Sequence, residues 1–372
     1  MNSYEPHDDY PAIVIDNGSS TCRVGLAGSD APLSVFPSLI GKRKQKLGVD
    51  RHYVGDEAQD KRELLNLSYP QEHGIIVNWE DMQRVWDHAF FTELRVSPEQ
   101  QPILISESPL NPKGNREKMA QVMFEVYNTP AFHIAFEPLL SLYSAGRVTG
   151  TIVSSGDGVT FTAPIFEGSA PHHCILRSDF AGRDLTLYLQ HLLYKKGYSF
   201  TTSSELETVK DIKEEACYIL NKSSTKSLSS LKPKTFKLPD GTPIQLDQEQ
   251  YMCPEILFKP DKVFNTGEGL PTMVYNCISS CDIHMRKELY SFVVLTGGTT
   301  FIPGFSERLQ RELQAVTPTA LTSVRVVAMP ERKYHVWIGG SLQASLTTFN
   351  QMWITRKEYN EYGPNIVHRR CS

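Results

Sequence analysis

Long apolar runs are missing from this sequence. No stretch of the 372 residues approaches the length that spans a bilayer, and the first ten residues, MNSYEPHDDY, are polar and acidic, unlike a secretory signal or a basic transit peptide. The formal net charge is only −4, so the charge balance gives no reason to expect nucleic acid or an anionic membrane as a partner. We therefore expect an intracellular protein that neither binds nucleic acid nor inserts into a membrane.

Cysteine is sparse, with seven residues scattered along the chain. Cys277 and Cys281 lie four positions apart, but no second cysteine or histidine pair completes a zinc-binding set. This arrangement predicts buried free thiols and no structural zinc. The expected exception is Cys371, which stands next to last in a polar tail and is predicted to be exposed and reactive.

The common nucleotide-binding signatures are also absent, since neither G-x-x-x-x-G-K-[ST] nor G-x-G-x-x-G occurs. Three other glycine-rich turns each follow an apolar run: DNGSS at 16–20, SGDG at 155–158 and LTGGTT at 295–300. Successive backbone N–H groups in such turns form concavities that bind anions. Asp16 and Asp157 would supply the one or two carboxylates with which a hydrated Mg²⁺ or Ca²⁺ is held beside phosphate oxygens. Together these features predict a nucleotide-phosphate site.

The chain is long enough for two domains, and its pattern predicts an α/β protein. Strand-like apolar runs lie at 12–17, 23–27, 102–106, 151–154, 160–165, 292–296 and 324–328. The stretch AIVIDNGSSTCRVGLAG (12–28) is similar to IVSSGDGVTFTAP (152–164), since both consist of an apolar run, a short polar turn and a second run. This repeat predicts two related halves, each beginning with a β-hairpin. In the second copy Ser154 stands in the place of Asp16.

Helical periodicity separates these strands. Residues 78–94, with Asn78 as the N-cap, and residues 115–128 each place apolar side chains on one face. Residues 204–220 open with Ser204 and Glu207 at the spacing of a capping box. Two polar segments, the Ser/Lys-rich 221–237 and the basic 41–52, are expected to be surface loops.

Over nearly its whole length the chain resembles the actin family. The resemblance rests on long segments that include YVGDEAQDKRELLNLSYPQEHGIIVNWEDM, SPLNPKGNREKMAQVMFEVYNTPAF, LTGGTTFIPGFSERLQRE, PERKYHVWIGGSL and the ending GPNIVHRRCS. It implies the actin-like ATPase fold, with two related lobes around a central cleft for ATP or ADP and a divalent cation. The implied subdomains comprise residues 1–37, 70–144 and 335–372 (subdomain 1), 38–69 (subdomain 2), 145–180 and 266–334 (subdomain 3), and 181–265 (subdomain 4).

The same resemblance implies a set of ligand-binding residues. Asp16 would face the hydrated metal ion, Mg²⁺ or Ca²⁺. Composition alone would rate Lys213, Glu214 and Lys333 as surface charges. The residues implied to line the nucleotide are Ser19, Ser20, Arg23, Gly156, Asp157, Gly158, Gly182, Lys213, Glu214, Gly297, Gly298, Thr299, Phe301 and Lys333.

The chain departs from the actin pattern at the positions implied to hydrolyse ATP. Ser154 stands where actins have the first Asp of D-S-G-D-G, Phe161 replaces the His of V-T-H-T, and Glu137 replaces a Gln that helps to orient water. Because phosphoryl transfer depends on placing water and spreading charge, these changes predict strongly reduced hydrolysis with nucleotide binding retained. Glu137 leaves alternatives open: its carboxylate could orient water in an active ATPase that forms dynamic filaments, or it could simply begin a helix before Pro138.

The segments implied to contact neighbouring subunits also differ from actin. The loop between Gly41 and Tyr53 is several residues shorter than in actins, and the segment 258–269 is more charged around Lys262. A loop that reaches less far buries less of its neighbour, so both changes predict altered polymerisation. A sugar kinase or chaperone ATPase of the same superfamily is disfavoured, because the sequence has no extra substrate-binding domain.

The cleft that actin-binding proteins use is implied to contain two matching and two altered residues. Tyr143 and Leu346 match actin, whereas Ser169 and Gln343 replace a Tyr and a Leu. The implied partners are subunits of this chain or of other actin-family proteins, and actin-binding proteins with altered affinity. The implied location is the cytoplasm with its cytoskeleton, with the nucleus left open.

Overall fold

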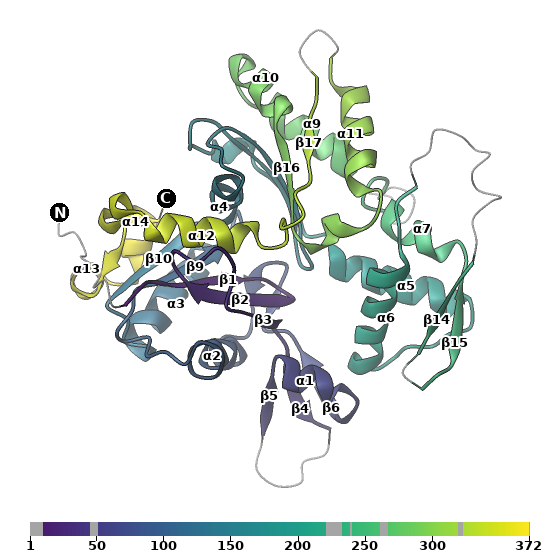
Figure 1. Ribbon diagram of the computed structural model, residues 1–372, viewed down its shortest axis with the longest axis horizontal. Helices are drawn as coiled ribbons and strands as arrows, with labels where there is room; N and C mark the ends of the chain where they lie inside the picture. The colour runs from purple at the N-terminus through teal and green to yellow at the C-terminus, as the bar shows by residue number, and fades with distance from the viewer. Residues whose placement is uncertain are drawn as a thin grey trace. The chain divides into compact units, whose positions relative to one another are not determined.

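The computed structural model describes residues 10–44, 51–220, 233–238, 240–260, 267–318 and 323–371. The chain divides into two compact units, each with its own sheet and helices (Figure 1). Unit 1 comprises residues 1–149, 167–170 and 330–372, and unit 2 comprises residues 150–166 and 171–329. These units agree with the two domains expected from chain length, whereas the division into four subdomains stays a prediction.

Unit 1 is built on a six-stranded sheet. Three of its strands, β1, β9 and β10, run parallel, and β1, β2 and β3 form an antiparallel meander. The parallel strands therefore end at one edge of the sheet, which is where open α/β sheets place their ligands. The strands lie in the order β18 (Ile354–Thr355), β10 (Ala131–Phe136), β9 (Ile103–Glu107), β1 (Ile13–Asn17), β2 (Thr21–Leu26) and β3 (Ser34–Pro37).

Helices cover both faces of this sheet. Because successive strand residues point to opposite faces, Ile13 and Ile15 join one core and Val14 joins another. The first core is completed by α2 (Trp79–Asp87) and α3 (Lys113–Gln121), each continued by a π-helical segment, η2 (His88–Leu94) and η3 (Val122–Val126). The second is completed by α4 (Glu137–Ser144) and α12 (His335–Ser345). These two helices pack so closely that a Cβ at Gly339 would lie 1.9 Å from the Leu140 carbonyl oxygen.

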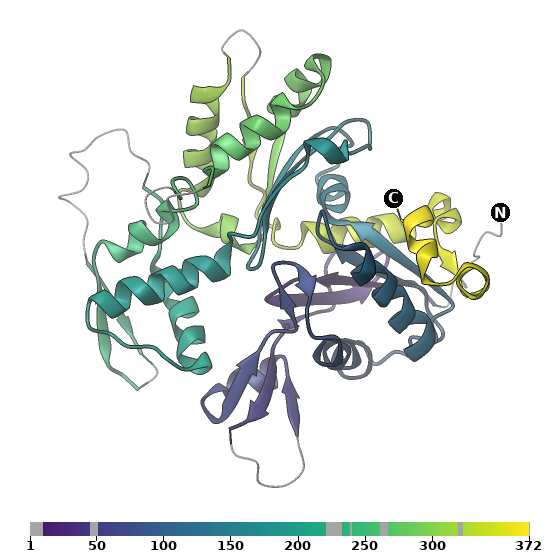
Figure 2. The ribbon, with the colours of Figure 1, turned by 180° about the vertical axis from the view of Figure 1, so that it is seen from behind.

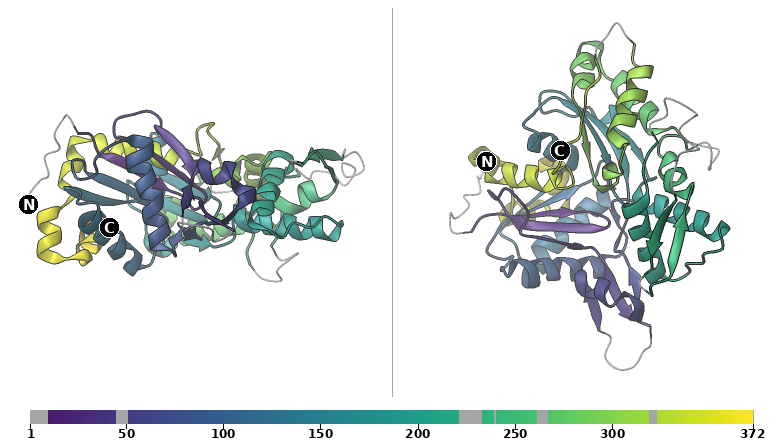
Figure 3. Two further views of the ribbon diagram at one scale, coloured as in Figure 1. Left: turned by 90° about the horizontal axis from the view of Figure 1, so that it is seen from below. Right: turned by 45° about the vertical axis from the view of Figure 1, so that its right-hand side comes forward.

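A smaller three-stranded sheet belongs to the same unit and lies at one end of it (Figures 2 and 3). Its strands are β5 (His52–Val54), β4 (Ile40–Arg43) and β6 (Leu65–Ser68), in that order, with α1 (Asp56–Asp60) and η1 (Arg62–Leu64) between β5 and β6. A separate small core of Leu39, Tyr53, Ala58 and Leu65 holds it together. We call residues 39–44 and 51–68 the β4 module. The remaining elements of unit 1 are β7 (Gln71–Glu72), β8 (Ile75–Ile76), η7 (Thr347–Gln351), α13 (Arg356–Tyr362), η8 (Pro364–Ile366) and α14 (Val367–Arg370).

Unit 2 repeats the arrangement of unit 1. An antiparallel meander of β11, β12 and β13 continues into the parallel strands β16 and β17. The repeated hairpin predicted from the sequence is therefore present as β1–β2 and as β11–β12. The sheet order is β13 (Leu176–Ser178), β12 (Thr160–Ile165), β11 (Gly150–Ser155), β16 (Val293–Thr296) and β17 (Val326–Val327).

The helices of unit 2 share one large hydrophobic core, and α5 and α6 lie side by side in it (Figure 2). Leu185, Leu189 and Leu193 form the buried stripe of α5, at the spacing expected for one helix face. The further elements are η4 (His172–Cys174), α5 (Gly182–Lys195), α6 (Ser203–Ala216), β14 (Lys234–Lys237), β15 (Pro243–Leu246), α7 (Glu249–Glu255), α9 (Leu270–Ser279), α10 (Ile283–Ser291), η6 (Gly298–Phe301) and α11 (Phe305–Val316).

Each predicted strand range overlaps an observed strand, and Asn78 caps α2 as predicted, its side chain accepting a hydrogen bond from the Asp81 N–H at 3.1 Å. The capping box of α6 was assigned to the wrong residues. The helix begins at Ser203, so Thr202 is the N-cap and Glu205 accepts from its N–H at 2.8 Å. The sequence TTSSELE has the spacing of a capping box both for Thr202 with Glu205 and for Ser204 with Glu207. At its other end the helix stops at Ala216, because Cys217 has an extended backbone.

The segment 221–237 was expected to be a loop throughout, but its last part is a strand. Residues 234–237 form β14 and pair with β15, and Phe236 packs against the core of unit 2. The alternating pattern of residues 234–237 is short and stands within a Ser/Lys-rich segment, so composition did not predict a strand there. Residues 221–232, the middle of the shortened loop (45–50) and Lys262 in the charged segment lie outside the described residues, whereas residues 41–43 and 52 belong to strands β4 and β5.

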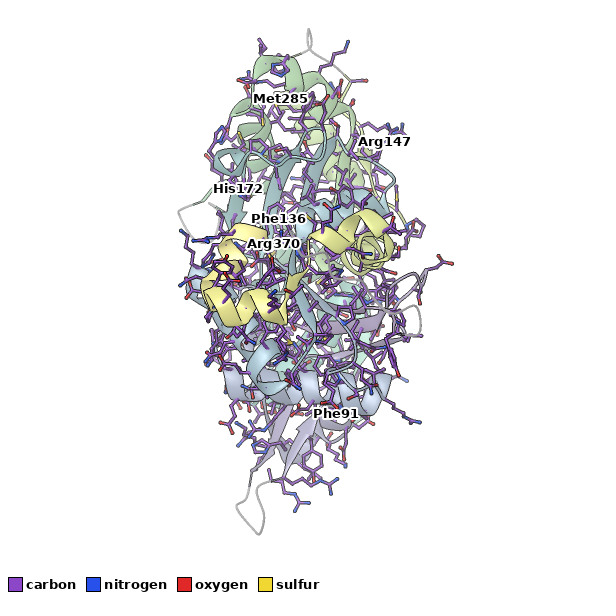
Figure 4. All side chains as sticks on the ribbon, turned by 90° about the vertical axis from the view of Figure 1, so that its left-hand side faces the viewer. Phe91, Phe136, Arg147, His172, Met285 and Arg370 are labelled. Carbon is purple, nitrogen blue, oxygen red and sulfur yellow. The ribbon has the colours of Figure 1, made fainter. Side chains whose placement is uncertain are left out.

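All seven cysteines fall within the described ranges, where they are buried and free, so the prediction for Cys371 is wrong. Its thiol accepts a hydrogen bond from the Ile134 N–H at 3.4 Å, and its carbonyl oxygen accepts one from Arg116. Burial raises the pKa of the Cys371 thiol to about 12. The C-terminal helices carry the tail back onto the sheet, and Arg370, labelled in Figure 4, fastens them by donating to the Trp353 carbonyl oxygen at 3.1 Å.

Candidate functional site

The β1–β2 hairpin of unit 1 holds a buried ion pair beside its turn. Asp16 and Arg23 face each other across the two strands, and Arg23 Nη1 lies 2.7 Å from Asp16 Oδ2. The other carboxylate oxygen accepts from the Ser106 hydroxyl at 2.9 Å, and Asp16 is only 6% exposed. The predicted metal-facing carboxylate is therefore held by two partners within unit 1.

The turn itself, residues 18–21, is fixed by neighbouring loops. The Ser38 hydroxyl donates to the Gly18 carbonyl oxygen at 3.0 Å, and the Ser19 hydroxyl accepts from the Gly74 N–H at 3.1 Å. A Cβ at Gly18 would lie 2.6 Å from the Thr21 carbonyl oxygen, so the turn requires glycine there. Ser20 is buried at the end of the turn.

Polar side chains gather where the parallel strands of unit 1 end. Asp16 is the penultimate residue of β1, Ser106 and Ser108 flank the end of β9, and Glu137 follows β10. Ser108 donates to Glu137 Oε2 at 2.9 Å, as Ser106 does to Asp16. Glu137 is the first residue of α4 and is followed by Pro138, as its structural interpretation predicted. Neither serine is among the predicted site residues, although Ser106 ends the predicted strand 102–106 and Ser108 follows it closely, which was the signal for both.

The β11–β12 hairpin of unit 2 has the same geometry with different chemistry. Ser155 pairs with Thr160, so the turn again contains four residues, 156–159, and the pair matching Asp16 and Arg23 is Ser154 with Phe161. Phe161 is completely buried and Ser154 is 2% exposed. A hydroxyl and a phenyl ring thus replace the charged cross-strand pair of the first copy.

The turn of the second hairpin is joined to the N-terminus of α5. The Gly156 carbonyl oxygen accepts from the Gly182 N–H at 3.0 Å and from the Thr299 hydroxyl at 2.6 Å. The next N–H along the helix, that of Arg183, donates to the Asp157 carbonyl oxygen at 2.8 Å. A Cβ at Gly182 would lie 2.6 Å from the Thr299 hydroxyl oxygen, so glycine permits this close approach. Three separate segments of unit 2, each containing predicted nucleotide-binding residues, therefore meet here.

Asp157 has a partner of its own. Arg183 Nη2 lies 3.1 Å from Asp157 Oδ2, which offsets the negative charge of this carboxylate. Gly297 adopts a φ of +87°, and a Cβ there would lie 2.3 Å from the Ser155 carbonyl oxygen. At Gly298, by contrast, an added Cβ would meet no described atom within 4 Å, and Phe301, three residues further along the chain, is 39% exposed. Within the LTGGTT turn, Gly297 therefore packs against the hairpin, whereas Gly298 faces open space.

The three charges that composition assigned to the surface differ in burial. Lys213 is buried, and its ammonium group donates to the Gly182 carbonyl oxygen at 2.6 Å and to the Thr186 hydroxyl at 2.9 Å. The composition-based interpretation is wrong for Lys213, because α6 packs against α5 and turns this side chain inward. Glu214 and Lys333 are exposed, and the Lys333 ammonium lies 4.8 Å from the centre of the Tyr334 ring.

The predicted cation site would depend on few protein ligands. Among the described residues, no group of three His, Cys, Asp or Glu side chains could hold a metal ion. A hydrated Mg²⁺ beside phosphate oxygens needs only one or two protein carboxylates. The Asp16 carboxylate supplies one such group near the carboxyl end of β1. Its oxygens can accept hydrogen bonds from the waters of a hydrated cation, so unit 1 fits such an ion through this residue.

The residues predicted for the partner cleft all belong to unit 1. Tyr143 lies at the end of α4 near the 167–170 segment, since an added Cβ at Gly168 would be 3.8 Å from its hydroxyl. Ser169 is exposed in that segment, and burial raises the pKa of Tyr143. Gln343 lies on α12, which packs on α4, and Leu346 follows that helix with 56% of its surface exposed. The structure thus brings these four residues onto neighbouring elements.

Two α/β units, each with a β-hairpin, a glycine-containing turn and adjoining parallel strands, fit the class of proteins with the actin-like ATPase fold. A family model for actin matches residues 7–372, nearly the whole chain. The chain therefore belongs to the actin family, and the resemblance seen in its sequence is confirmed. Proteins of this family typically bind a nucleotide with a divalent cation and associate with one another and with actin-binding proteins. Within the described ranges, none of the helices is both long and apolar enough to cross a membrane.

Proposed function

We propose that this protein is a divergent actin that binds ATP or ADP with Mg²⁺ or Ca²⁺, hydrolyses ATP slowly or not at all, and assembles differently from actin. The main observation behind the proposal is that Ser154 and Phe161 occupy, in the second hairpin, the positions that Asp16 and Arg23 occupy in the first. Its proposed location is the cytoplasm and its cytoskeleton, with the nucleus left open.

Nucleotide binding is supported by the turns themselves. The Gly156–Gly158 turn, the start of α5 and the LTGGTT turn meet within unit 2, and glycine-rich turns of this kind can bind phosphate. In unit 1, the Asp16 carboxylate would hold waters of the cation. When bound, the cation would supply charge neutralisation for the phosphate oxygens.

Slow hydrolysis is supported by the chemistry of the replaced residues. The buried Phe161 ring neither donates nor accepts a proton, and Ser154 carries no charge. Positioned acid–base groups typically contribute about 10²–10⁴-fold to a rate, so losing them slows the reaction by a similar factor. The bound nucleotide would still stabilise the protein, because a ligand that binds the folded state does so whether or not it is cleaved.

The second candidate function is an active ATPase that forms dynamic filaments. The hydrogen bond from Ser108 to Glu137 Oε2 favours it, because a carboxylate held in one orientation can direct its other oxygen toward water. The balance favours the first candidate, since a carboxylate beside phosphate oxygens is electrostatically unfavourable.

Phosphate release from the purified full-length protein with ATP and Mg²⁺ tests the proposal. We expect a rate at least about 100-fold below that of ordinary actin, and a clear rise in the Ser154→Asp/Phe161→His/Glu137→Gln variant. A sustained rate equal to that of actin would establish the second candidate. Identifying the nucleotide released on mild denaturation tests binding separately from hydrolysis, and a protein that releases none and is not stabilised by added ADP would contradict nucleotide binding.

Altered assembly and altered partners rest on the shortened 41–52 segment and on Ser169 and Gln343 in the partner cleft. Pelleting and light scattering, with and without ATP, measure self-assembly. Assembly with the critical concentration of actin would contradict this part of the proposal.

A further inference from the structure

Three cationic side chains are gathered around one tyrosine in the β4 module. Arg43 Nη2 donates to the Tyr53 hydroxyl at 3.2 Å. The Arg51 guanidinium carbon and the Lys61 ammonium lie 5.1 and 4.6 Å from the centre of the Tyr53 ring. Tyr53 itself is 4% exposed and belongs to the core of the module. We call these four residues the Tyr53 cluster.

The acidic residues near the cluster compensate only part of its charge. Glu57 pairs with Lys61 at 2.5 Å and with Arg51 at 3.6 Å, so one carboxylate is shared by two cations. Arg43 donates its hydrogen bond to the Tyr53 hydroxyl and not to a carboxylate, and this bond lowers the pKa of Tyr53. The neighbouring Lys44 ammonium donates to the backbone oxygen of Glu63 and not to a carboxylate. Positive charge therefore remains uncompensated on this side of the module.

The cluster is also held in place before any ligand arrives. Long cationic side chains lose rotamer freedom when they bind an anion, and this loss weakens exposed ion pairs. Here Arg51 and Lys61 already rest on an aromatic ring, an arrangement stabilised by cation–π attraction, and Arg43 is hydrogen-bonded to the same residue. At the same time the side chain of Arg51 is 64% exposed and that of Lys61 is 43% exposed, so both remain accessible.

We propose that the Tyr53 cluster is a docking site for an acidic peptide segment, rich in Asp or Glu, of a protein partner. The cluster presents a few fixed cations within a small area, which suits one or two carboxylates on a short segment. A nucleic acid or an anionic bilayer would require a broader basic face, and the whole chain carries a net charge of −4, which opposes attraction to extended polyanions. The proposal is independent of nucleotide binding.

Fluorescence anisotropy with a labelled peptide of eight glutamates, titrated with the full-length protein, tests this site. We expect saturable binding that weakens as salt is added, since exposed charges are screened over about 10 Å at 0.1 M ionic strength. The Arg43→Gln/Arg51→Gln variant should bind the peptide about five- to thirtyfold more weakly and show less salt dependence. The reason is that two of the exposed ion pairs expected between the protein and the peptide cannot form. Both positions are on the surface, and thermal unfolding checks that the variant folds.

The control for a general loss of charge is Lys287→Gln, which removes one positive charge from an exposed position on α10 and should leave peptide binding unchanged. A peptide of eight glutamines, a single-stranded oligonucleotide and vesicles containing phosphatidylserine form the comparison arms, and all three should bind much more weakly than the acidic peptide. Equal loss of binding in the Lys287→Gln protein would overturn the proposal by showing a non-specific charge effect. Unchanged binding in the double variant, or preference for the oligonucleotide or the vesicles, would overturn it as well.

Discussion

Asp16 and Arg23 provide the sharpest test of how unit 1 combines stability with ligand binding. The pair is nearly buried, since the two side chains are only 8% and 15% exposed. Removing one partner of a buried pair leaves the other charge without compensation and typically costs about 3–5 kcal/mol. Because both side chains keep a small exposure to solvent, we expect the lower end of this energy range, so Asp16→Asn should lower the free energy of unfolding by about 3 kcal/mol.

Asn at position 16 would still accept the hydrogen bond from Ser106, so the loss comes mainly from stranding the Arg23 guanidinium. The Nε atom of Arg23 already lacks a hydrogen-bond partner within the described residues. Loss of the carboxylate would therefore leave the guanidinium with a second unsatisfied N–H group. For a unit of about 200 residues, 3 kcal/mol corresponds to a fall in Tm of roughly 6–12 °C. Arg23→Met should cost a similar amount, because it strands Asp16 instead.

The double variant Asp16→Asn/Arg23→Met separates the two roles of Asp16. It contains no stranded charge, so we expect it to recover most of the stability lost by either single variant, which a double-mutant cycle measures as coupling of about 2–3 kcal/mol. Its stabilisation by nucleotide should remain reduced with Mg²⁺, since the carboxylate proposed to hold the hydrated cation is gone. Thermal unfolding of all four proteins, with and without ADP and Mg²⁺, provides both quantities. Additive losses in the double variant would refute the ion-pair reasoning, and full recovery of nucleotide stabilisation would refute the ligand role of Asp16.

Two further perturbations test the pH response and the packing at α5. Burial lowers the pKa of His133 and of His335 to about 4 each, so between pH 6.5 and 4 the unfolded chain binds protons that the folded chain does not. Stability should therefore fall by about 2 kcal/mol per histidine from pH 7 to pH 5 in denaturant unfolding, and His335→Gln should flatten this dependence; an unchanged slope would contradict the assignment. Gly182→Ala should cost about 1–3 kcal/mol and weaken nucleotide binding, because the new methyl group would displace the Thr299 hydroxyl from Gly156. Gly114→Ala in α3, where an added Cβ meets no described atom within 4 Å, is the control that should lose neither stability nor nucleotide binding.

The fold could be predicted from the sequence largely because its strands are apolar, short and bounded by turn residues. The two hairpins, the N-cap at Asn78 and the α/β class all followed from local patterns. What failed depended on tertiary context. Cys371 is buried because distant helices return the tail to the sheet, and the capping box of α6 has two equivalent registers in the sequence. In both places, local composition was compatible with more than one structure.

The site could be predicted in part, for a similar reason. The three glycine-rich turns are visible in the sequence, and the structure brings two of them together at the start of α5. Lys213 cannot be recognised as buried from composition, because its position depends on α6 packing against α5. Ser106 and Ser108 acquire their partners only when parallel strands align, since those partners lie in β1 and after β10. Residues whose partners lie on a neighbouring strand can therefore be recognised only when the register of the sheet is known.

That register also changes how the missing carboxylate of the second hairpin should be tested. Because Ser154 faces Phe161 across the strands, Ser154→Asp alone would place a carboxylate beside a buried ring, with no cation at the position that Arg23 occupies in unit 1. Burial would raise the pKa of this carboxyl group, so the variant should be destabilised by several kcal/mol at pH 7 and progressively less as the pH falls and the group is protonated. Phe161→His in addition supplies a protonatable partner and should restore part of the stability at pH 6. If Ser154→Asp alone is as stable as the parent protein at pH 7, the two residues are not a coupled pair, and their joint departure from actin has no common physical cause.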